Sequence, residues 1–392
     1  MTCNDSAHRG GRPRRSLGRR LRRDQKGMAL VLVGTGLMAI LSVTILTVDV
    51  GMMMTARGQA QNSADAGALA GAVAFVYEDF ADRSASGPAV QNALSAARAN
   101  QVMSQQVSVG PGDVTFPAID RVRVTVFRTA GRGNPVSTLV AQYFGIPTAD
   151  IFATATAEAA PSNAVTCVKP FTIPDRWDER QTPPWDPDDT FDLYDKKGKP
   201  LANPDVYVPA TAESGYTGYD PYEHKGLRLV LKAGNDNKIA PSFYYPWRIP
   251  GSNGADDYTW AIANCNTTIV HFGDDMDPEN GNMSGPTAQG VEELIARDLN
   301  AYWDTATNSV VSDYTPSPRV GVIPLFDPEF YETGKHNGQN ASLKAANFIG
   351  IFIEGMEGNN VIGRVTPVGG LIDGSAGPAP AGAFPKTTRL VQ

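Results

Sequence analysis

Residues 29–48 read ALVLVGTGLMAILSVTILTV, a run of twenty residues without a charged side chain. A helix rises about 1.5 Å per residue, so this run would form a helix about 30 Å long, which matches the hydrocarbon core of a bilayer. The run is longer than the apolar region of a cleaved signal peptide, which is the main alternative. Asp49-Val50-Gly51 also follows it in place of a small-x-small cleavage site. We therefore predict a retained transmembrane helix over residues 28–50.

Charge is distributed unevenly on the two sides of this run. Residues 1–26 hold nine basic side chains and two acidic ones, whereas the whole chain of 392 residues has a net charge of −7. Basic segments stay on the cytoplasmic side of a membrane helix. The pattern predicts a single-pass membrane protein with a short cytoplasmic segment (1–27) and an extracytoplasmic C-terminal bulk. Clustered arginine also suits nucleic-acid phosphates, but the positive-inside rule explains this cluster, and we expect no nucleic-acid partner.

The helix is expected to continue beyond the membrane. Residues 52–80 are rich in Ala, Gln and Met and contain no proline, which favours a helix. Small residues recur at intervals of three or four along both parts: Thr35, Ala39, Ser42, Ala56, Ala60, Ser63, Gly67, Ala70 and Ala74. Such a stripe lets two helices approach closely and would allow an oligomer to form through the N-terminal helix. The alternative is that an alanine-rich sequence places small residues on every face.

Asp49 lies at the outer end of the predicted span. Ionisable groups near a membrane are costly unless they are solvated or paired. Two interpretations follow: the carboxylate is solvated at the membrane interface, or it pairs with a basic group of a partner.

Three motifs between Gln25 and Ala74 carry a resemblance to a known family. They are QKGMALVLV at the start of the apolar run, TVDVG at its end, and QAQNSADAGALAGAVA after it. In combination they resemble the N-terminal segment of TadE/TadG-like proteins of the tight-adherence (Flp) pilus assembly system. The resemblance implies a minor pilin or pilus-assembly factor of the bacterial envelope. Such a protein would have the lipid bilayer and other pilus-assembly or envelope proteins as its partners.

Two motifs of that family are missing. Prepilin-like members have a glutamate five residues after the processing glycine, whereas Leu32 lies five residues after Gly27. The resemblance therefore does not predict processing at Gly27. TadG proteins with a von Willebrand type A domain show Asp-x-Ser-x-Ser, and here Asp373-Gly374-Ser375 is followed by Ala376-Gly377. The adhesion-type metal site of those domains is absent from this sequence.

The part after the membrane divides at Pro161, where the composition changes. Residues 51–160 predict a pilin-like α+β module, with helices at 89–106 and 139–144 and strands at 121–128 and 151–159. Residues 161–392 accumulate proline, aspartate and aromatic residues and predict a β-rich extracytoplasmic domain. Its strands are expected at 227–232, 319–326 and 348–354, its helix at 287–299, and a loose Gly/Pro-rich region at 369–385. The predicted fold class is α+β.

Two clusters have the residue types of a binding site or a cross-link. Asp274, Asp275, Asp277 and Glu279 concentrate carboxylate oxygens that suit Ca²⁺, although a solvated acidic loop gives the same pattern. Cys167 and Cys265 would both be extracytoplasmic and could form a disulfide, but their separation in sequence leaves the pairing open.

Nothing in the sequence points to catalysis. The four histidines are scattered, and no Gly-x-Ser-x-Gly motif supplies a nucleophile. We predict a non-catalytic structural or assembly component of a Flp pilus, with no cofactor unless Ca²⁺ binds. The alternative is a membrane-anchored extracytoplasmic glycan- or Ca²⁺-binding protein unrelated to pili. Its contact surface or its core would contain the aromatic residues Trp177, Trp185, Tyr216, Tyr219, Tyr222, Tyr244, Tyr245 and Trp247.

Overall fold

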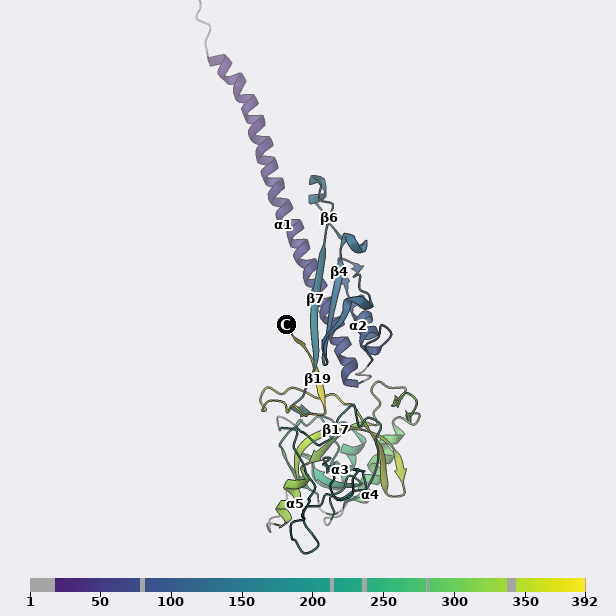
Figure 1. Cartoon of the computed structure of the whole chain (residues 1–392). Coiled ribbons are helices and arrows are strands. Elements are labelled where there is room, and N and C mark those ends of the chain that lie inside the picture. Colours follow the sequence, from purple (N-terminus) through teal and green to yellow (C-terminus); the bar gives the residue numbers. More distant parts are fainter. Residues whose placement is uncertain are drawn as a thin grey trace, which may run out of the picture.

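The computed structural model describes residues 18–77, 82–211, 215–234, 238–279, 281, 283–336 and 343–391. Three parts follow one another along the molecule (Figure 1). The N-terminal half of helix α1 (Gly18–Tyr77) projects alone, a narrow stalk module surrounds its C-terminal half, and a wider head domain lies at the far end. The fold is α+β, as predicted, with a long apolar helix followed by a β-rich domain.

The stalk module is built on a four-stranded antiparallel sheet in the order β19-β7-β4-β3. Its strands are β3 (Val114–Ala118), β4 (Arg121–Arg128), β7 (Ile151–Pro161) and β19 (Lys386–Val391). Helix α1 lies on one face of this sheet, and α2 (Pro88–Ala99) packs beside it. The small pairs are β1 (Gln101–Val102) with β2 (Gln105–Gln106) and β5 (Val136–Ser137) with β6 (Thr148–Ala149). The 3-10 turns are η1 (Pro111–Asp113), η2 (Ala130–Arg132) and η3 (Ala141–Phe144).

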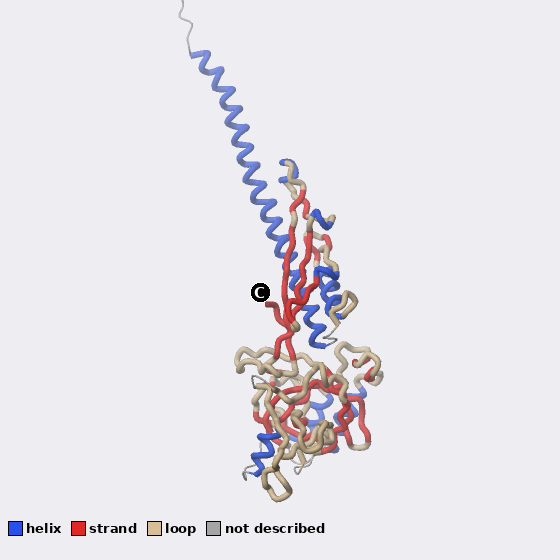
Figure 2. The backbone as a smooth tube through the Cα atoms, viewed as in Figure 1, coloured by secondary structure: helices blue, strands red, loops and turns tan. Residues whose placement is uncertain are grey.

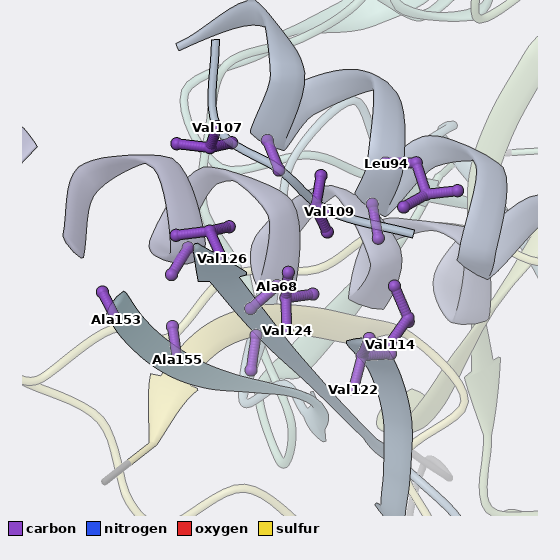
Figure 3. Packing of buried hydrophobic residues seen from close by; sticks show 14 of the residues in the cluster. Ala68, Leu94, Val107, Val109, Val114, Val122, Val124, Val126, Ala153 and Ala155 are labelled. Carbon is purple, nitrogen blue, oxygen red and sulfur yellow. The ribbon is translucent and has the colours of Figure 1, made fainter. Parts of the chain in front are cut away.

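Buried apolar and more exposed polar side chains alternate along β4, which gives the sheet two different faces. Val122, Val124 and Val126 are fully buried against the helices, as their spacing predicted (Figure 3). The intervening residues Arg121, Arg123 and Thr125 face away from the helices and pair with Glu158, Thr156 and Thr154 of β7. Because side chains alternate across a strand, one valine face and one polar face result from the sequence itself.

The head domain is inserted into the stalk sheet. The chain leaves the stalk after Pro161 and returns at Lys386, where β19 pairs with β7 (Figure 2). Glu158 of β7 accepts hydrogen bonds from Arg121 and Arg389, which links the returning strand to β4. The predicted boundary of 161–392 is therefore corrected, because residues 386–391 belong to the stalk. We define the stalk module as residues 51–161 with 386–391, and the head domain as residues 162–385.

The strands of the head domain pair in a closed ring. Each strand pairs with its neighbours in the order β10-β18-β17-β16-β9-β11 and back to β10, and β13 lies between β11 and β17. These strands are β9 (Phe171–Pro174), β10 (Arg228–Ala233), β11 (Phe243–Arg248), β13 (Asp275–Pro278), β16 (Val320–Phe326), β17 (Leu343–Glu357) and β18 (Asn360–Thr366). Closure leaves few unpaired strand edges.

Shorter elements surround this ring. Two small pairs are formed by β8 (Ala164–Val165) with β12 (Val270–His271) and by β14 (Tyr302–Asp304) with β15 (Ser309–Val311). The helices are α3 (Gly254–Ala263), α4 (Ser284–Ala296) and α5 (Pro328–His336). Helices α3 and α4 pack together, and both α4 and α5 contact β17.

Two local predictions are corrected. The helix predicted at 89–106 ends at Ala99, because Asn100 is extended and Met103 and Ser104 have positive φ in the β1–β2 turn. The region 369–385 is mostly loop, with Leu371 41% and Ile372 50% exposed, and the correction concerns only its end, residues 383–385, which are buried. Phe384 is 1% exposed, and its N–H donates to Asn347 Oδ1.

Candidate functional site

The apolar part of α1 is uncovered by any other described part of the chain. It is long enough and apolar enough to cross a membrane, and the window that meets this test is wholly exposed. Leu30, Val33 and Met38 are each at least 70% exposed. Side chains of this kind are stable in such numbers only in an apolar environment. An exposed apolar helix therefore continues without interruption into the stalk module.

Asp49 lies where the exposed apolar part of α1 meets the stalk module. The side chain is 5% exposed, and its Oδ1 accepts the backbone N–H of Leu139 at 2.8 Å. Oδ2 accepts the N–H of Val140 at 3.1 Å and that of Ala141 at 2.5 Å. Three successive amides around one carboxylate make an anion-binding nest, in which each donor is charge-assisted. The carboxylate is therefore buried rather than solvated, and the partners that the structure describes are backbone amides of the same chain. We call this contact the Asp49 clamp.

The small-residue stripe divides into two parts with different surroundings. Beyond the apolar run it packs inside the stalk: a Cβ on Gly67 would lie 3.0 Å from Ala97 Cβ and 3.1 Å from the carbonyl oxygen of Ala93. Ser63 is fully buried and donates to the Ala97 carbonyl at 2.8 Å. Gly58, on another face of α1, has nothing within 4 Å. The part of the stripe beyond the apolar run therefore holds α2 and the sheet close to α1.

The other part of the stripe lies in the apolar run. Thr35, Ala39 and Ser42 are exposed in the described structure. The hydroxyls of Thr35 and Ser42 donate to the carbonyls of Val31 and Met38, one turn earlier. These hydrogen bonds satisfy the hydroxyl protons within the helix, so all three positions present a small surface that a second helix could approach.

The acidic residues proposed for Ca²⁺ do not converge. Asp274 accepts the backbone N–H of His271, and Glu279 pairs with Arg248 at 3.2 Å. Asp275 and Asp277 lie in β13 and are exposed. Among the described residues, no group of three or more His, Cys, Asp or Glu side chains is placed to hold a metal ion. These carboxylates are spread along β13 and the residues beside it, whereas a Ca²⁺ site needs six to eight oxygens around one point.

Cys167 and Cys265 form a disulfide bond. The bond joins the first segment of the head domain to the chain just after α3, and the N–H of Cys167 donates to the carbonyl of Asn266 at 2.8 Å. A cross-link of this kind suits an oxidising compartment outside the cytoplasm.

Two ionisable groups with strongly shifted pKa values lie inside the head domain. Burial raises the pKa of Asp175 to about 6, and the carboxylate accepts hydrogen bonds from the hydroxyls of Tyr207 and Tyr216. Burial lowers the pKa of Lys169 to about 7, and its Nζ donates to the carbonyl of Ile262 at the C-terminal end of α3. Both groups are enclosed and satisfied by protein partners. Neither side chain is among the residues that line the cleft of the head domain described below.

A histidine, an aspartate and a serine also lie together near the point where the head joins the stalk. His271 Nε2 lies 2.9 Å from Asp373 Oδ2, and Ser375 Oγ donates to Asp373 Oδ1 at 2.7 Å. In a catalytic triad the hydroxyl contacts the imidazole, whereas here it contacts the carboxylate. The hydrogen bond to Asp373 raises the pKa of His271, and the same bond lowers the pKa of Asp373 to about 2. This cluster is a cross-link between segments rather than a nucleophile with its base.

The head domain also has a cleft of about 510 Å³. Its lining includes Arg176, Arg180, Trp185, Pro183 and Pro184, and the Arg176 guanidinium stacks over the Trp185 ring at 5.0 Å. Most of the other aromatic residues singled out in the sequence are core residues, since Trp177, Tyr219, Tyr244 and Trp247 are at most 1% exposed.

Sequence reasoning did not find the partners of Asp49. Leu139 is 90 positions away, and no feature of the LVAQYF sequence predicts that its backbone amides bind a carboxylate. The sequence contained one relevant signal: a carboxylate directly after an apolar run. Such a carboxylate needs a hydrogen-bond donor or solvent.

Comparison with known families agrees with the resemblance in the sequence. Residues 27–74 match the family model described as "Putative Flp pilus-assembly TadE/G-like". The matched segment contains the exposed apolar part of α1, Asp49 and the small-residue stripe as far as Ala74. No curated protein and no solved structure matches the chain. The match supports a role in Flp pilus assembly.

Proposed function

We propose that this chain is a non-enzymatic, membrane-anchored structural or assembly component of a Flp pilus system in the bacterial envelope. One observation carries the proposal: the segment that matches the TadE/G-like family is the segment in which an uncovered apolar helix continues into a packed stalk. In this arrangement the basic N-terminus lies in the cytoplasm, and both folded parts lie outside. The disulfide and the acidic balance of the chain support that orientation.

The geometry suits a component that holds other proteins at a fixed distance from the membrane. Because α1 is one helix from the span to Tyr77, the stalk cannot pivot freely about a flexible linker. The head is held by two crossing segments rather than one, since the chain enters at Ser162 and returns at Lys386. The exposed stripe at Thr35, Ala39 and Ser42 provides a face for another membrane helix, from a second copy or from a pilus-assembly protein.

Deletion and complementation test the proposal. A strain that lacks this chain should lose surface pili and attachment, and the chain should co-purify with pilus-assembly proteins from the membrane fraction. A complementing Ala39→Leu variant should fail to restore pili if the stripe binds a partner, whereas Met38→Leu, its exposed neighbour, should restore them. Normal pili and attachment in the deletion strain would contradict the proposal.

Cysteine labelling tests the orientation. Tyr314 is 56% exposed on the head domain, so a Tyr314→Cys variant should react with a membrane-impermeant maleimide in spheroplasts. Cys3 provides the internal control, because it should react only after the membrane is permeabilised. Labelling of Cys3 but not of the introduced cysteine in intact spheroplasts would show the opposite topology.

A second candidate function is favoured by the cleft of the head domain. Aromatic rings and prolines offer flat apolar faces, and arginines supply hydrogen-bond donors, which together suit a saccharide. Calorimetry of the full chain in detergent with envelope glycans tests it, with Trp185→Ala as the variant expected to lose binding. If no glycan gives a measurable heat of binding, saccharide binding is rejected, and the pilus proposal is unaffected.

A further inference from the structure

The hairpin formed by β5 and β6 ends in an apolar tip, residues 138–147. This segment contains no charged residue. Four of its large side chains are more than half exposed: Leu139 at 56%, Tyr143 at 82%, Phe144 at 59% and Ile146 at 58%. Single exposed hydrophobic residues are common on protein surfaces, but four within eight positions of one short loop indicate a contact surface.

The apolar tip is an ordered structure. Thr138 donates from its N–H to Pro147 O at 3.0 Å and from its hydroxyl to Ile146 O at 2.5 Å, which closes the base of the loop. Gly145 ends η3 with φ of +85°, and the N–H of Ile146 bonds back to Ala141 O. The exposed rings are therefore held in place by backbone geometry, and the chain has not buried them although the loop is folded.

The Asp49 clamp determines where the apolar tip lies. The amides that surround the Asp49 carboxylate belong to Leu139, Val140 and Ala141, which are residues of the tip itself. Asp49 directly follows the uncharged run of residues 29–48. In Figure 1 the β5–β6 hairpin is the part of the stalk that extends furthest along α1 toward its N-terminal end. The tip is thus fastened beside the outer end of the apolar run.

We propose that the apolar tip enters the outer interfacial region of the same bilayer that α1 crosses, and forms a second membrane contact. Tyr is favoured at the level of the lipid headgroups, where its apolar ring and its polar hydroxyl are both satisfied, and Phe and Leu side chains are favoured just below that level. Two attachments, a span and a clamped tip, would fix the tilt of the stalk and its rotation about the long axis of α1. The inference rests on the proposed anchoring by α1.

Depth-dependent quenching in reconstituted vesicles tests the tip and the anchor separately. The full chain carries Cys3→Ser, keeps its disulfide, and has one introduced cysteine labelled with an environment-sensitive nitrobenzoxadiazole dye. The three sites are Tyr143→Cys in the tip, Val43→Cys in the apolar run, and Tyr314→Cys on the head. The vesicles contain phosphatidylethanolamine and phosphatidylglycerol, with or without doxyl-labelled phosphatidylcholine as a lipid-borne quencher.

We expect the dye at position 143 to be blue-shifted and quenched by the doxyl lipid, as the dye at position 43 is, and the dye at position 314 to respond only to aqueous iodide. Quenching at 43 without quenching at 143 would overturn the tip contact and leave the anchor intact. Protection from both quenchers at 143 would also overturn it, because a protein rather than lipid would then cover the tip. Absence of lipid quenching at both position 43 and position 143 would contradict the proposed membrane anchoring by α1.

A paired substitution gives a second readout that does not depend on a dye. Tyr143→Ser with Phe144→Ser makes the tip polar without touching the amides that bind Asp49. The variant should retain its melting temperature but show increased mobility of the stalk relative to the membrane, measured by fluorescence anisotropy of a head label. Phe152→Ser on β7, 67% exposed but away from the tip, is the matched control and should leave the anisotropy unchanged. Unchanged anisotropy in the tip variant would contradict the proposal.

Discussion

The stalk module and the head domain have cores of different kinds. The buried cluster of the stalk is made mostly of alanine and valine, and Phe75 is its one member among the largest fully buried side chains. The head domain buries the others of that group: Trp177, Trp247, Tyr219, Tyr244, Tyr258, Phe171, Phe326, Phe348, Phe352, Phe384 and Ile173. Small residues allow a helix to lie close to a sheet, whereas a ring of strands encloses a space that only large side chains fill.

This difference predicts opposite sensitivities to mutation. A core of small residues loses little when a methyl group is removed, but it has no room for a larger side chain. A core of aromatic residues loses much when a ring is removed, because a cavity remains. The two regions can be followed separately, since all five tryptophans, from Trp177 to Trp303, lie in the head domain.

The largest effect is expected from Phe348→Ala in the head domain. Phe348 is fully buried, and its ring meets that of Phe272 edge-on at 5.0 Å. Loss of a buried phenylalanine ring costs about 3–5 kcal/mol of unfolding free energy. Tryptophan fluorescence during denaturation measures it. Phe330→Ala, at a 46% exposed ring, should change the midpoint little, and equal losses in the two variants would contradict the assignment of the head core.

The next effect is expected from Gly71→Leu in the stalk module. A Cβ there would already lie 2.9 Å from Val122 Cγ1, so the larger side chain should destabilise the stalk by about 1–3 kcal/mol. The thermal loss of far-ultraviolet helical signal measures it, while the tryptophan transition should not move. At Gly58, with nothing within 4 Å, the same substitution should be neutral or stabilising by up to about 1 kcal/mol, because leucine favours a helix. A destabilised Gly58→Leu would show that crowding is not the cause.

A local effect is expected from Asp49→Asn at the junction of the span and the stalk. The amide side chain has one acceptor oxygen, and its NH₂ group would face an N–H donor of the tip. Hydrogen exchange at Leu139, Val140 and Ala141 should therefore accelerate, with little change elsewhere. Asp65→Asn, on the same helix and hydrogen-bonded to Gln61, is the control. Unchanged protection at the three amides would show that the Asp49 clamp does not hold the tip.

The smallest effect is expected from titration of His271. Because its pKa is raised in the folded protein, its contribution to stability is present below its ordinary pKa of 6.5 and is lost as the pH rises through the raised value. The groups that face it are Asp274 and Asp373. Because both side chains are partly exposed, solvent weakens the pair and its contribution to stability should be small. The protection of the Ser375 amide relative to its intrinsic exchange rate should therefore fall as the pH rises above 6.5. His271→Gln should remove this dependence, and its persistence in that variant would assign it to another group.

Local patterns in the sequence predicted much of the fold. The valine alternation in β4 and the apolar runs of β16 and β17 appear as strands, and the helix predicted at 287–299 is α4, at Ser284–Ala296. Helices α3 and α5 were not predicted. Their apolar residues are interrupted by Asp257 and by Gly334, and they form because they pack against α4 and β17. The family resemblance is confirmed over residues 27–74.

The sequence by itself determined that an uncharged helix of bilayer length continues as an alanine-rich helix, because length, charge and periodicity are properties of neighbouring residues. Only the tertiary structure decided which groups distant in the chain meet. Arg389 binds Glu158 across 231 positions, Asp49 binds amides 90 or more positions away, and the strands of the head close into a ring. Each of these contacts depends on how the two ends of a long loop are brought together, and no local pattern encodes that.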